Sequence, residues 1–449
     1  RVRSSAASDV YKRQLENLLS FSLLKRLVND HMLSIHRLVQ AIQMDMMEPG
    51  EQRAWAERVV RAVNTLFPPN PHEIASWPRC LRYLEQAQMC STLIQQHLLL
   101  LPEAADLLER TGTYLREHAT YTTAESLYRQ ALQMREQLLG PDHLQVASSL
   151  NNLGNLYHKQ GKYTEVELLF QRVLRIRERQ LGSEHLEVAH ALHNLAALYK
   201  DQGKYSQAEP LFQQALQIEG NQLGPEHLHV TPLLNNLAVL YSHQGKYAEA
   251  EALFQRALSI REHHLDTKHP DIAYSLNGLA NLYYNQKRYT EAEPLYQRAL
   301  QIRELQFGPL HPLVGTLLNN LAELFATQRK YAEAESLYQR ALAIWEQHLG
   351  PEHHRVAVIL TDLGNLYTDL GAYTKAEPLY QRALSIHEHT SGTTHSDIAD
   401  TLHQFATLRE IQGQIQDTLA LYQQALKIRT QALGPVSYTH LRAHETGRN

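Results

Sequence analysis

Apolar positions recur along this chain with helical spacing, in pairs of segments separated by short polar breaks. In one segment, Val146, Leu150, Leu153 and Tyr157 follow one another at spacings of four, three and four, which is the apolar stripe of an amphipathic helix. A Gln-Gly-Lys break follows, and its glycine is suited to a left-handed helix end. A second stripe then runs to a glycine near residue 182. The pattern predicts helical hairpins.

The hairpin repeats without gaps, and about eight units fit between residues 103 and 435. Three columns of identical residues carry the 42-residue period: His143, His185, His227, His269, His311, His353 and His395; Leu153, Leu195, Leu237, Leu279, Leu321 and Leu363; Ile176, Ile218, Ile260, Ile302, Ile344, Ile386 and Ile428. One hairpin cannot be stable alone, because burying about six apolar side chains at roughly 1.5–3 kcal/mol each does not offset ordering at roughly 1–2 kcal/mol per residue. Neighbouring units must share a core, which predicts a solenoid.

Polar residues of the repeat have structural interpretations. Capping boxes are predicted at the starts of the second helices, at Thr164–Glu167, Ser206–Glu209, Thr290–Glu293 and Thr374–Glu377. The Glu-rich stretches YAEAEALF and YAEAESLY are interpreted as helix starts with solvated faces. One histidine per unit cannot converge on a metal ion, because helices pack about 10 Å apart and ligands lie about 2 Å from zinc. The histidines are therefore expected in turns or caps.

The string LNNLGNLYHKQGKYTEVELLFQRVLRIRERQLG, repeated with small changes, resembles the tetratricopeptide repeat, specifically the 42-residue variety of kinesin light chains. The resemblance covers about three-quarters of the chain. It implies an all-α fold, a right-handed superhelical solenoid in which the first helix of each unit lines a concave groove that binds peptides. In the last unit, Phe405, Arg409, Ile415 and Thr418 replace the usual Leu, Tyr, Tyr and Ala. That unit is interpreted as a degenerate cap or as an internal unit of a longer array.

On a helical wheel, the polar side of each first helix is the side that this family turns into the groove. Stacking the units predicts a ladder of side-chain amides along the groove, formed by Asn151, Asn152, Asn155, His193, Asn194, Asn235, Asn236, Asn277, Asn281, Asn319, Asn320 and Asn365. Asparagine both donates and accepts, so it can pair with the backbone of an extended peptide. The alternative is that these amides hydrogen-bond between adjacent first helices. Specificity is assigned to variable positions: His190, Lys200, Tyr274, Tyr284 and Glu323. A clamp for a C-terminal carboxylate is not predicted, since Asn151 and Pro232 occupy positions where such clamps have lysine.

Composition narrows the function classes. The formal charge is -4; residues 1–14 carry +3 and residues 436–449 carry +1, which leaves -8 on the other 421 residues. This acidic balance argues against binding nucleic acid. Two cysteines fit a reducing compartment, and no apolar run reaches the roughly 20 residues of a membrane helix. We therefore expect a cytoplasmic protein without membrane contact. No phosphate loop, GxSxG, HExxH or paired CxxC occurs, so no enzyme activity, cofactor or metal is predicted for this segment.

The two ends of the chain are interpreted separately. Residues 1–14 and 436–449 fit no pattern in the rest and resemble translated sequencing-adapter read-through, so they are left out of the fold prediction and the chain is expected to be a fragment. In residues 15–48, LENLLSFSLLKRL predicts a helix, NDHMLSIH an extended or hairpin stretch, and RLVQAIQMDMM another helix. Residues 49–102 are expected to be a helical connector.

The string SLLKRLVNDHMLSIHRLVQAIQMDM resembles the winged-helix end of NB-ARC signal-transduction ATPases. The resemblance implies a sensor arm whose superhelix holds a protein partner or restrains its own ATPase domain, with the nucleotide-binding motifs upstream of Arg1. Two alternatives stay open, a kinesin-light-chain-like adaptor and the sensor array of an unrelated effector enzyme. Upstream sequence discriminates the three: a phosphate loop, a coiled-coil heptad or another catalytic motif.

Overall fold

Helix pairs build most of the molecule. The computed structural model describes residues 24–27, 32–35, 47–118, 120–390 and 396–433, and within them sixteen consecutive helices form eight pairs. In chain order they are α5 (Pro102–Glu117), α6 (Tyr121–Leu139), α7 (Leu144–Lys159), α8 (Tyr163–Leu181), α9 (Leu186–Asp201), α10 (Tyr205–Leu223), α11 (Thr231–His243, preceded by the short η2, Leu228–Val230), α12 (Tyr247–His264), α13 (Pro270–Asn285), α14 (Tyr289–Phe307), α15 (Pro312–Thr327), α16 (Tyr331–Leu349), α17 (His354–Asp369), α18 (Tyr373–Thr390), α19 (Ser396–Ile411) and α20 (Ile415–Leu433).

The breaks between helices follow the predicted turn chemistry. Gly161, between α7 and α8, has φ +71°, and Gly182, after α8, has φ +86°. Both values lie in the left-handed region, which glycine adopts without steric cost. In two units the first of these glycines is replaced by Lys287 or Arg329, each at φ +61°. The backbone of the turn is therefore kept where its glycine is lost.

The repeated histidines cap the first helices, which confirms the predicted role. In each case Nδ1 accepts a hydrogen bond from the main-chain N–H two residues later, at 3.1–3.3 Å. The residues are His143, His185, His227, His269, His311 and His353. The last member of the predicted column, His395, lies outside the described residues.

The predicted capping boxes were wrong for α8, α10 and α14. These helices begin at the tyrosine, two residues earlier than a box with threonine or serine as its N-cap requires, and the residues before them make no side-chain cap. The glutamate of the predicted box instead accepts a hydrogen bond from the next unit, as Tyr199 Oη donates to Glu167 Oε1 at 2.9 Å. The interpretation of YAEAEALF and YAEAESLY as helix starts is confirmed by α12 and α16, and Glu249 and Glu333 are exposed as predicted. The second glutamate of each stretch, however, also binds the next unit. Glu251 accepts from Tyr283 at 2.7 Å, and Glu335 accepts from Tyr367 at 2.6 Å.

Small residues let the two helices of a pair approach closely. A Cβ atom on Gly154 would lie only 2.5 Å from the ring of Phe170, and the equivalent alanines, Ala196, Ala238, Ala280 and Ala322, are fully buried. The leucine column beside them is 3–4 % exposed in all six units. Apolar clusters run on from one unit to the next, for example from α5 as far as α11. The core is therefore shared along the array, as a solenoid requires.

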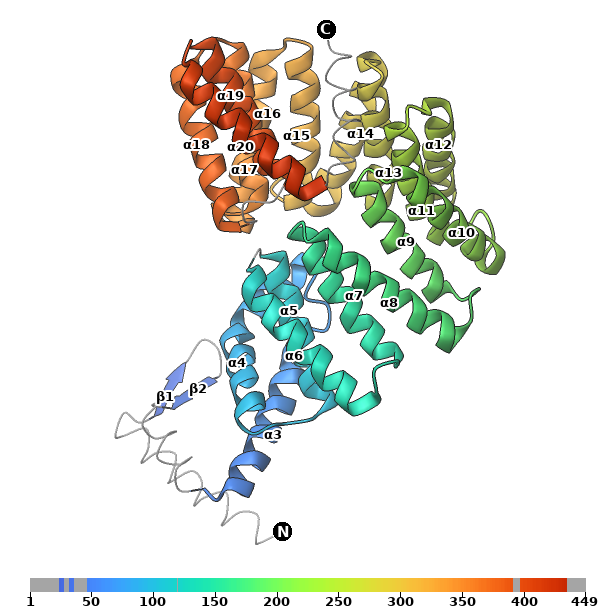
Figure 1. The fold of residues 1–449 in the computed structure, drawn as a ribbon, viewed down its shortest axis with the longest axis vertical. Coiled ribbons are helices and arrows are strands. Elements are labelled where there is room, and N and C mark those ends of the chain that lie inside the picture. Colours follow the sequence, from blue (N-terminus) through green and yellow to red (C-terminus); the bar gives the residue numbers. More distant parts are fainter. Residues whose placement is uncertain (1–23, 28–31, 36–46, 119, 391–395, 434–449) are drawn as a thin grey trace.

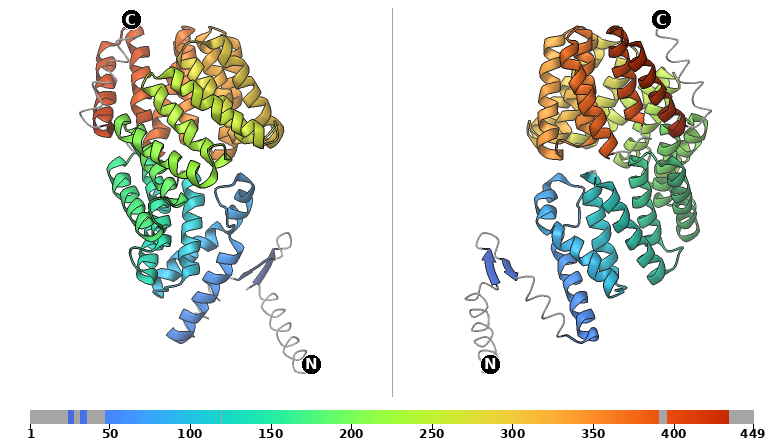
Figure 2. Two further views of the ribbon diagram at one scale, coloured as in Figure 1. Left: turned by 90° about the vertical axis from the view of Figure 1, so that its right-hand side faces the viewer. Right: turned by 60° about the vertical axis from the view of Figure 1, so that its left-hand side comes forward.

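The array curves through one turn. Figure 1 shows it passing from α5 in the lower part, through α8–α12 on the right, to α15–α20 above, so that the late helices come back over the early ones. Figure 2 shows the same stacking from two further directions. The helices α3 (Pro49–Leu66) and α4 (Trp77–Gln96), with the short η1 (Ile74–Ser76) between them, pack on the first pair.

The segment before α3 is described only in part. Strands β1 (Leu24–Leu27) and β2 (Met32–Ile35) form an antiparallel hairpin. The prediction of an extended or hairpin stretch over NDHMLSIH is confirmed by β2, whereas the helix predicted over LENLLSFSLLKRL was wrong at its last four residues, which form β1. Most of the predicted helix RLVQAIQMDMM and both predicted adapter-like ends lie outside the described residues. The winged-helix prediction stays a prediction.

Candidate peptide-binding groove

The first helices of the units form the inner surface of the curve. Each first helix contacts the first helices of neighbouring units as well as its own partner, for example α11 with α9 and α13, and α15 with α13 and α17. The second helices α6, α8, α10 and the later ones make their main contacts with first helices. Helices on the concave side of a curved stack lie closer together than those on the convex side. The polar side of the first helices therefore lines a concave groove.

Several of the predicted amides hydrogen-bond from one first helix to the next along the groove. We call this series of bonds the staircase and each bond a rung. Asn194 Nδ2 donates to Asn151 Oδ1 at 2.8 Å, and Asn320 Nδ2 donates to Asn277 Oδ1 at the same distance. Asn236 Nδ2 lies 2.8 Å from His193 Nε2. Each amide thus pairs with the residue one position earlier in the preceding unit. The sequence left open the alternative that the amides hydrogen-bond between adjacent first helices. The amides in these rungs do so.

The staircase is interrupted once, between the fourth and fifth pairs. Gly278 stands at the position of the donating asparagine, because a Cβ atom there would lie 2.5 Å from the ring of Phe254. Asn235, on the preceding helix, is only 2 % exposed, and its Oδ1 has no hydrogen-bond partner. Its Nδ2 makes a long bond of 3.4 Å to Ser275 Oγ. Asn235 therefore lies below the groove surface.

Other amides of the prediction lie nearer to solvent. Asn152 and Asn155 are half-buried, and no partner for either side chain occurs among the described residues. Asn281 is exposed; its Oδ1 accepts from Tyr296 Oη at 2.5 Å. Asn365 accepts from Tyr380 Oη at 2.7 Å. Asn319 hydrogen-bonds to Asp362 on the next first helix. These side chains keep N–H groups available on the concave face, since each amide has two.

The variable positions give the two halves of the groove different chemistry. In the first half, His190 is about half exposed with Nε2 3.9 Å from Glu219, and Lys200 Nζ lies 3.4 Å from Asp201. In the second half, Tyr284 Oη donates to Glu323 Oε1 at 3.2 Å and lies 2.9 Å from Thr327 Oγ1. Tyr274 is 47 % exposed, with the Arg261 guanidinium over its ring at 5.4 Å.

Burial shifts the protonation of several groove side chains. Burial and the nearby Glu323 raise the pKa of Asp362 to about 7, against the hydrogen bond from Asn319. Burial lowers the pKa of His193 to about 4, with help from His190 and Lys200. The second half of the groove therefore gains negative charge near neutral pH, whereas His193 is neutral there.

Sequence reasoning missed a column of charged residues on the second helices. Arg135 Nη2 lies 2.7 Å from Asp106, and its Nη1 lies 2.7 Å from Glu109. Arg177 binds Glu187 at 2.9 Å. At the same position of later second helices, Glu219 interrupts this column of arginines, and Arg261 and Arg303 continue it. Their common 42-residue spacing was visible in the sequence and could have identified them as contacts between units.

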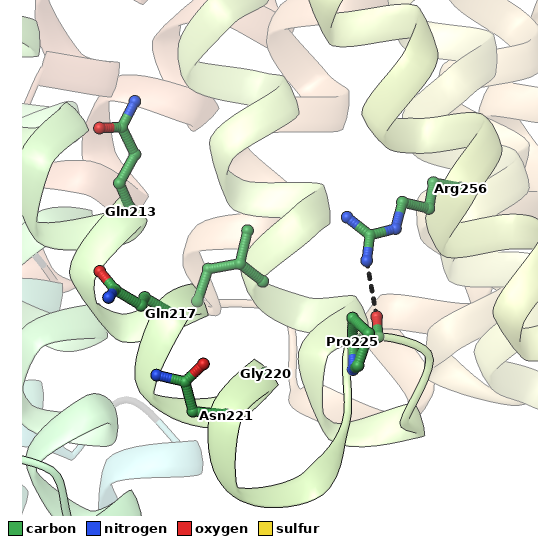
Figure 3. A pocket seen from close by; sticks show the side chains of 7 residues that line it. Gln213, Gln217, Gly220, Asn221, Pro225 and Arg256 are labelled. Atoms are coloured by element: carbon green, nitrogen blue, oxygen red, sulfur yellow. Dashed lines mark hydrogen bonds between the residues drawn. The ribbon is translucent and has the colours of Figure 1, made fainter.

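A cavity of about 400 Å³ lies away from the groove, among residues of α10 and α12. Figure 3 shows its lining, with Gln213, Gln217 and Asn221 on one side and Arg256 on the other. In other units the equivalent arginine binds a glutamate of the preceding second helix, as Arg298 binds Glu262 at 2.7 Å. Gly220 replaces that glutamate here, and Arg256 pairs instead with Glu226 at 3.2 Å while it donates to the Pro225 carbonyl at 2.7 Å. The cavity thus lies where the other units have the glutamate side chain.

The described ranges contain neither a metal-binding cluster nor a membrane-spanning helix. No three histidine, cysteine, aspartate or glutamate side chains there are placed to hold a metal ion. No helix in that part of the chain is both long and apolar enough to span a bilayer.

The fold and the groove define a helical-repeat scaffold for protein interactions. The pattern of the tetratricopeptide repeat family matches the chain in overlapping segments, residues 103–179, 169–219, 187–263, 229–304, 271–347, 313–389 and 355–431. The chain therefore belongs to the tetratricopeptide repeat family.

Individual proteins are similar over parts of the chain. A nucleotide-binding leucine-rich repeat (NLR)-like protein of Hyaloscypha variabilis is 33 % identical over 140 residues, which cover 30 % of this chain and 13 % of that protein. The crystal structure of BtubC (BKLC) from P. vanneervenii is 26 % identical, with a TM-score of 0.41, over 52 % of this chain and 91 % of that one. A Rap protein complexed with Competence and Sporulation Factor is 15 % identical, with a TM-score of 0.56, over 80 % of this chain and 97 % of that one. The last match shows a common fold.

Proposed function

We propose that the concave groove binds an extended segment of a protein partner, and that the amides of the first helices hydrogen-bond to its backbone. The observation that carries the proposal is the line of half-buried amides along one continuous face. Asn194 uses one N–H in its rung and keeps the second for a ligand. Nδ2 of Asn236 also donates to the Pro232 carbonyl at 3.2 Å, and Nδ2 of Asn320 also donates to Asn281 Oδ1 at 3.4 Å, so these two donors offer a ligand less. Asn152 and Asn155 form no rung at all with the described residues.

The energetics call for many contacts. A net hydrogen bond contributes about 0.5–1.5 kcal/mol, and a micromolar complex needs about 8 kcal/mol. Several amides acting together, with side-chain contacts at the variable positions, can reach that value. Glu323 and Asp362 favour a basic residue of the partner in the second half of the groove. Lys200 favours an acidic residue in the first half, so the groove also orients the bound segment.

The Rap structure supports groove binding by analogy. Its fold matches most of this chain, and it was solved in complex with Competence and Sporulation Factor. A superhelix of this kind can therefore hold a separate molecule. The identity of 15 % carries nothing about which ligand this chain prefers.

We further propose that the array is the sensor arm of an NB-ARC type signalling protein. The match to an NLR-like protein supports this context, although the matched segment spans only 13 % of that protein. A kinesin-light-chain-like adaptor and an unrelated effector are the alternatives. The coding sequence upstream of residue 15 tests the assignment: a phosphate loop supports it, and a coiled-coil heptad or a different catalytic motif contradicts it.

Groove binding is tested with peptides selected from a random library on the intact chain. The variant Asn152→Ala/Asn155→Ala removes two groove amides that have no partner among the described residues, so the fold should be unaffected. The matched control is Gln255→Ala/Gln297→Ala, which removes two exposed amides from second helices α12 and α14. We expect the groove variant to lose about tenfold or more in affinity, since two hydrogen bonds contribute about 1–3 kcal/mol. Equal affinity of the two variants for every selected peptide contradicts the proposal.

A further inference from the structure

One histidine of the capping column differs from its equivalents. His353 is 6 % exposed, whereas His143 and His227 are exposed and His185, His269 and His311 are half-buried. All six make the same capping bond to the main chain. Something other than the repeat itself therefore covers His353.

The cover comes from the opposite end of the array. The His353 side chain hydrogen-bonds to the main chain of Glu117, the last residue of α5, and lies close to His118 and Lys159. These residues end the first helices of the first two pairs, while His353 begins the first helix of the seventh. Figures 1 and 2 show the late helices lying above the early ones. The superhelical turn thus closes on itself.

The closure is a thin, polar seam, made by Glu117, His118 and Lys159 on one side and His353, His354 and Arg355 on the other. Lys159 Nζ binds Glu117 Oε2 at 3.2 Å, and Arg355 is also attracted to Glu117. A second point of approach brings Asp397 of α19 near Tyr163 of α8. Among the described residues, no early helix packs extensively on a late one. Neighbouring units, by contrast, share apolar cores, so the seam is the weakest interface of the array.

We propose that this seam is a latch, which holds the groove in a closed turn at neutral pH and opens when His353 and His354 take up protons. Opening would admit a folded or bulky partner to the groove from the side. That last step rests on the proposed groove function, but the latch itself does not.

The charges around the two histidines set the direction of the pH effect. Lys159 of α7, His118 of α5 and Arg355 of α17 oppose protonation, while Asp397 of α19 favours it at His354 and the Glu117 carboxylate is engaged by Lys159 and Arg116. Burial, followed by these cations, lowers the pKa of His353 to about 3 and that of His354 to about 2. In the open form both would titrate near the ordinary value of about 6.5. The closed form is therefore fully favoured above about pH 6.5 and loses up to about tenfold in population per histidine for each pH unit below it.

Small-angle X-ray scattering of the chain, without any partner, measures closure directly. We expect a larger radius of gyration at about pH 5 than at about pH 7.5, with unchanged helical circular dichroism. For one histidine the ratio of closed to open forms falls by about 30-fold between about pH 7.5 and about pH 5. The same radius at both values overturns the proposal.

Matched variants separate the latch from the cap. His353→Ala and His311→Ala each remove one helix cap, but only the first touches the seam, so only the first should expand the chain at about pH 7.5. Equal radii for the two alanine variants overturn the latch. This comparison does not bear on peptide binding, which is measured with the Asn152 and Asn155 variant.

Discussion

The interrupted staircase provides an internal control for the structural role of the amides. Asn277 accepts a 2.8 Å bond from Asn320, whereas Asn235, its equivalent one unit earlier, has an acceptor without a partner because Gly278 replaces the donor. Asn277→Ala should therefore cost more stability than Asn235→Ala. Both substitutions remove the same atoms from the same position of a first helix, so helix propensity cancels in the comparison.

The magnitudes follow from the hydrogen bonds. Asn277→Ala deletes one rung, and a net amide hydrogen bond contributes about 0.5–1.5 kcal/mol. Asn235→Ala deletes a buried, unpaired carbonyl oxygen, whose burial costs about 1–3 kcal/mol, along with one long bond of 3.4 Å to Ser275. These two contributions oppose each other, so we expect a net change within about 0.5 kcal/mol. The expected difference between the variants is about 1 kcal/mol.

Urea unfolding followed by circular dichroism measures the difference. The midpoints are compared at equal slope, because repeat arrays can depart from two-state unfolding. A loss of stability in Asn235→Ala equal to or larger than that in Asn277→Ala refutes the staircase as described. A third variant, Asn320→Ala, removes the donor of the same rung and should reproduce the effect of Asn277→Ala.

Two further predictions test other features. Gly220→Glu should stabilise the chain by about 1 kcal/mol, mainly because glutamate has a better helix propensity than glycine. The new carboxylate also offers Arg256, which already pairs with Glu226 at 3.2 Å, the inter-helix partner that its equivalents have. Thermal unfolding beside Gly220→Ala separates the two contributions, and no gain of Glu over Ala contradicts a stabilising role for the inter-helix pair. Affinity for a selected peptide carrying lysine or arginine opposite Asp362 should rise as the pH increases from about 6 to 8, since this carboxyl loses its proton near pH 7; fluorescence titration of Asp362→Asn should show a flat profile, and a persisting rise contradicts the assignment. The raised pKa also means that folding stability falls as the pH rises from about 4 to 7, because the folded state holds the proton more tightly.

Local chemistry in the sequence predicted the units well. The helical spacing of apolar residues predicted the helices, the glycines predicted left-handed turns such as that at Gly161, and the histidine column predicted the helix caps. These features depend on residues a few positions apart, and repetition every 42 residues made each of them visible several times. The family resemblance predicted that the first helices line the concave side of the array.

Features that depend on neighbouring units were harder to predict. The glutamate of the expected capping box binds Tyr199 of the next unit rather than its own helix start, and sequence spacing alone does not separate these two geometries. Asn235 was predicted among the groove amides, but its burial goes with Gly278 on the next first helix, which packs against Phe254 of Asn235's own unit. The spacing of the asparagines alone does not reveal this. The meeting of His353 with Glu117 depends on small rotations summed over six units, which no local pattern encodes.

Photo-crosslinking of a selected peptide is the most direct test of the account's central claim, that the first helices together form the binding surface. A benzophenone residue is placed in turn at each peptide position, and the attachment sites are mapped by mass spectrometry. The account predicts attachments on the concave faces of the first helices α7, α9, α11, α13, α15 and α17. These helices should be marked in order along the peptide, about one for every three residues, because an extended residue spans about 3.3 Å and helices pack about 10 Å apart. Attachments concentrated on the second helices, or on α3 and α4, would contradict it.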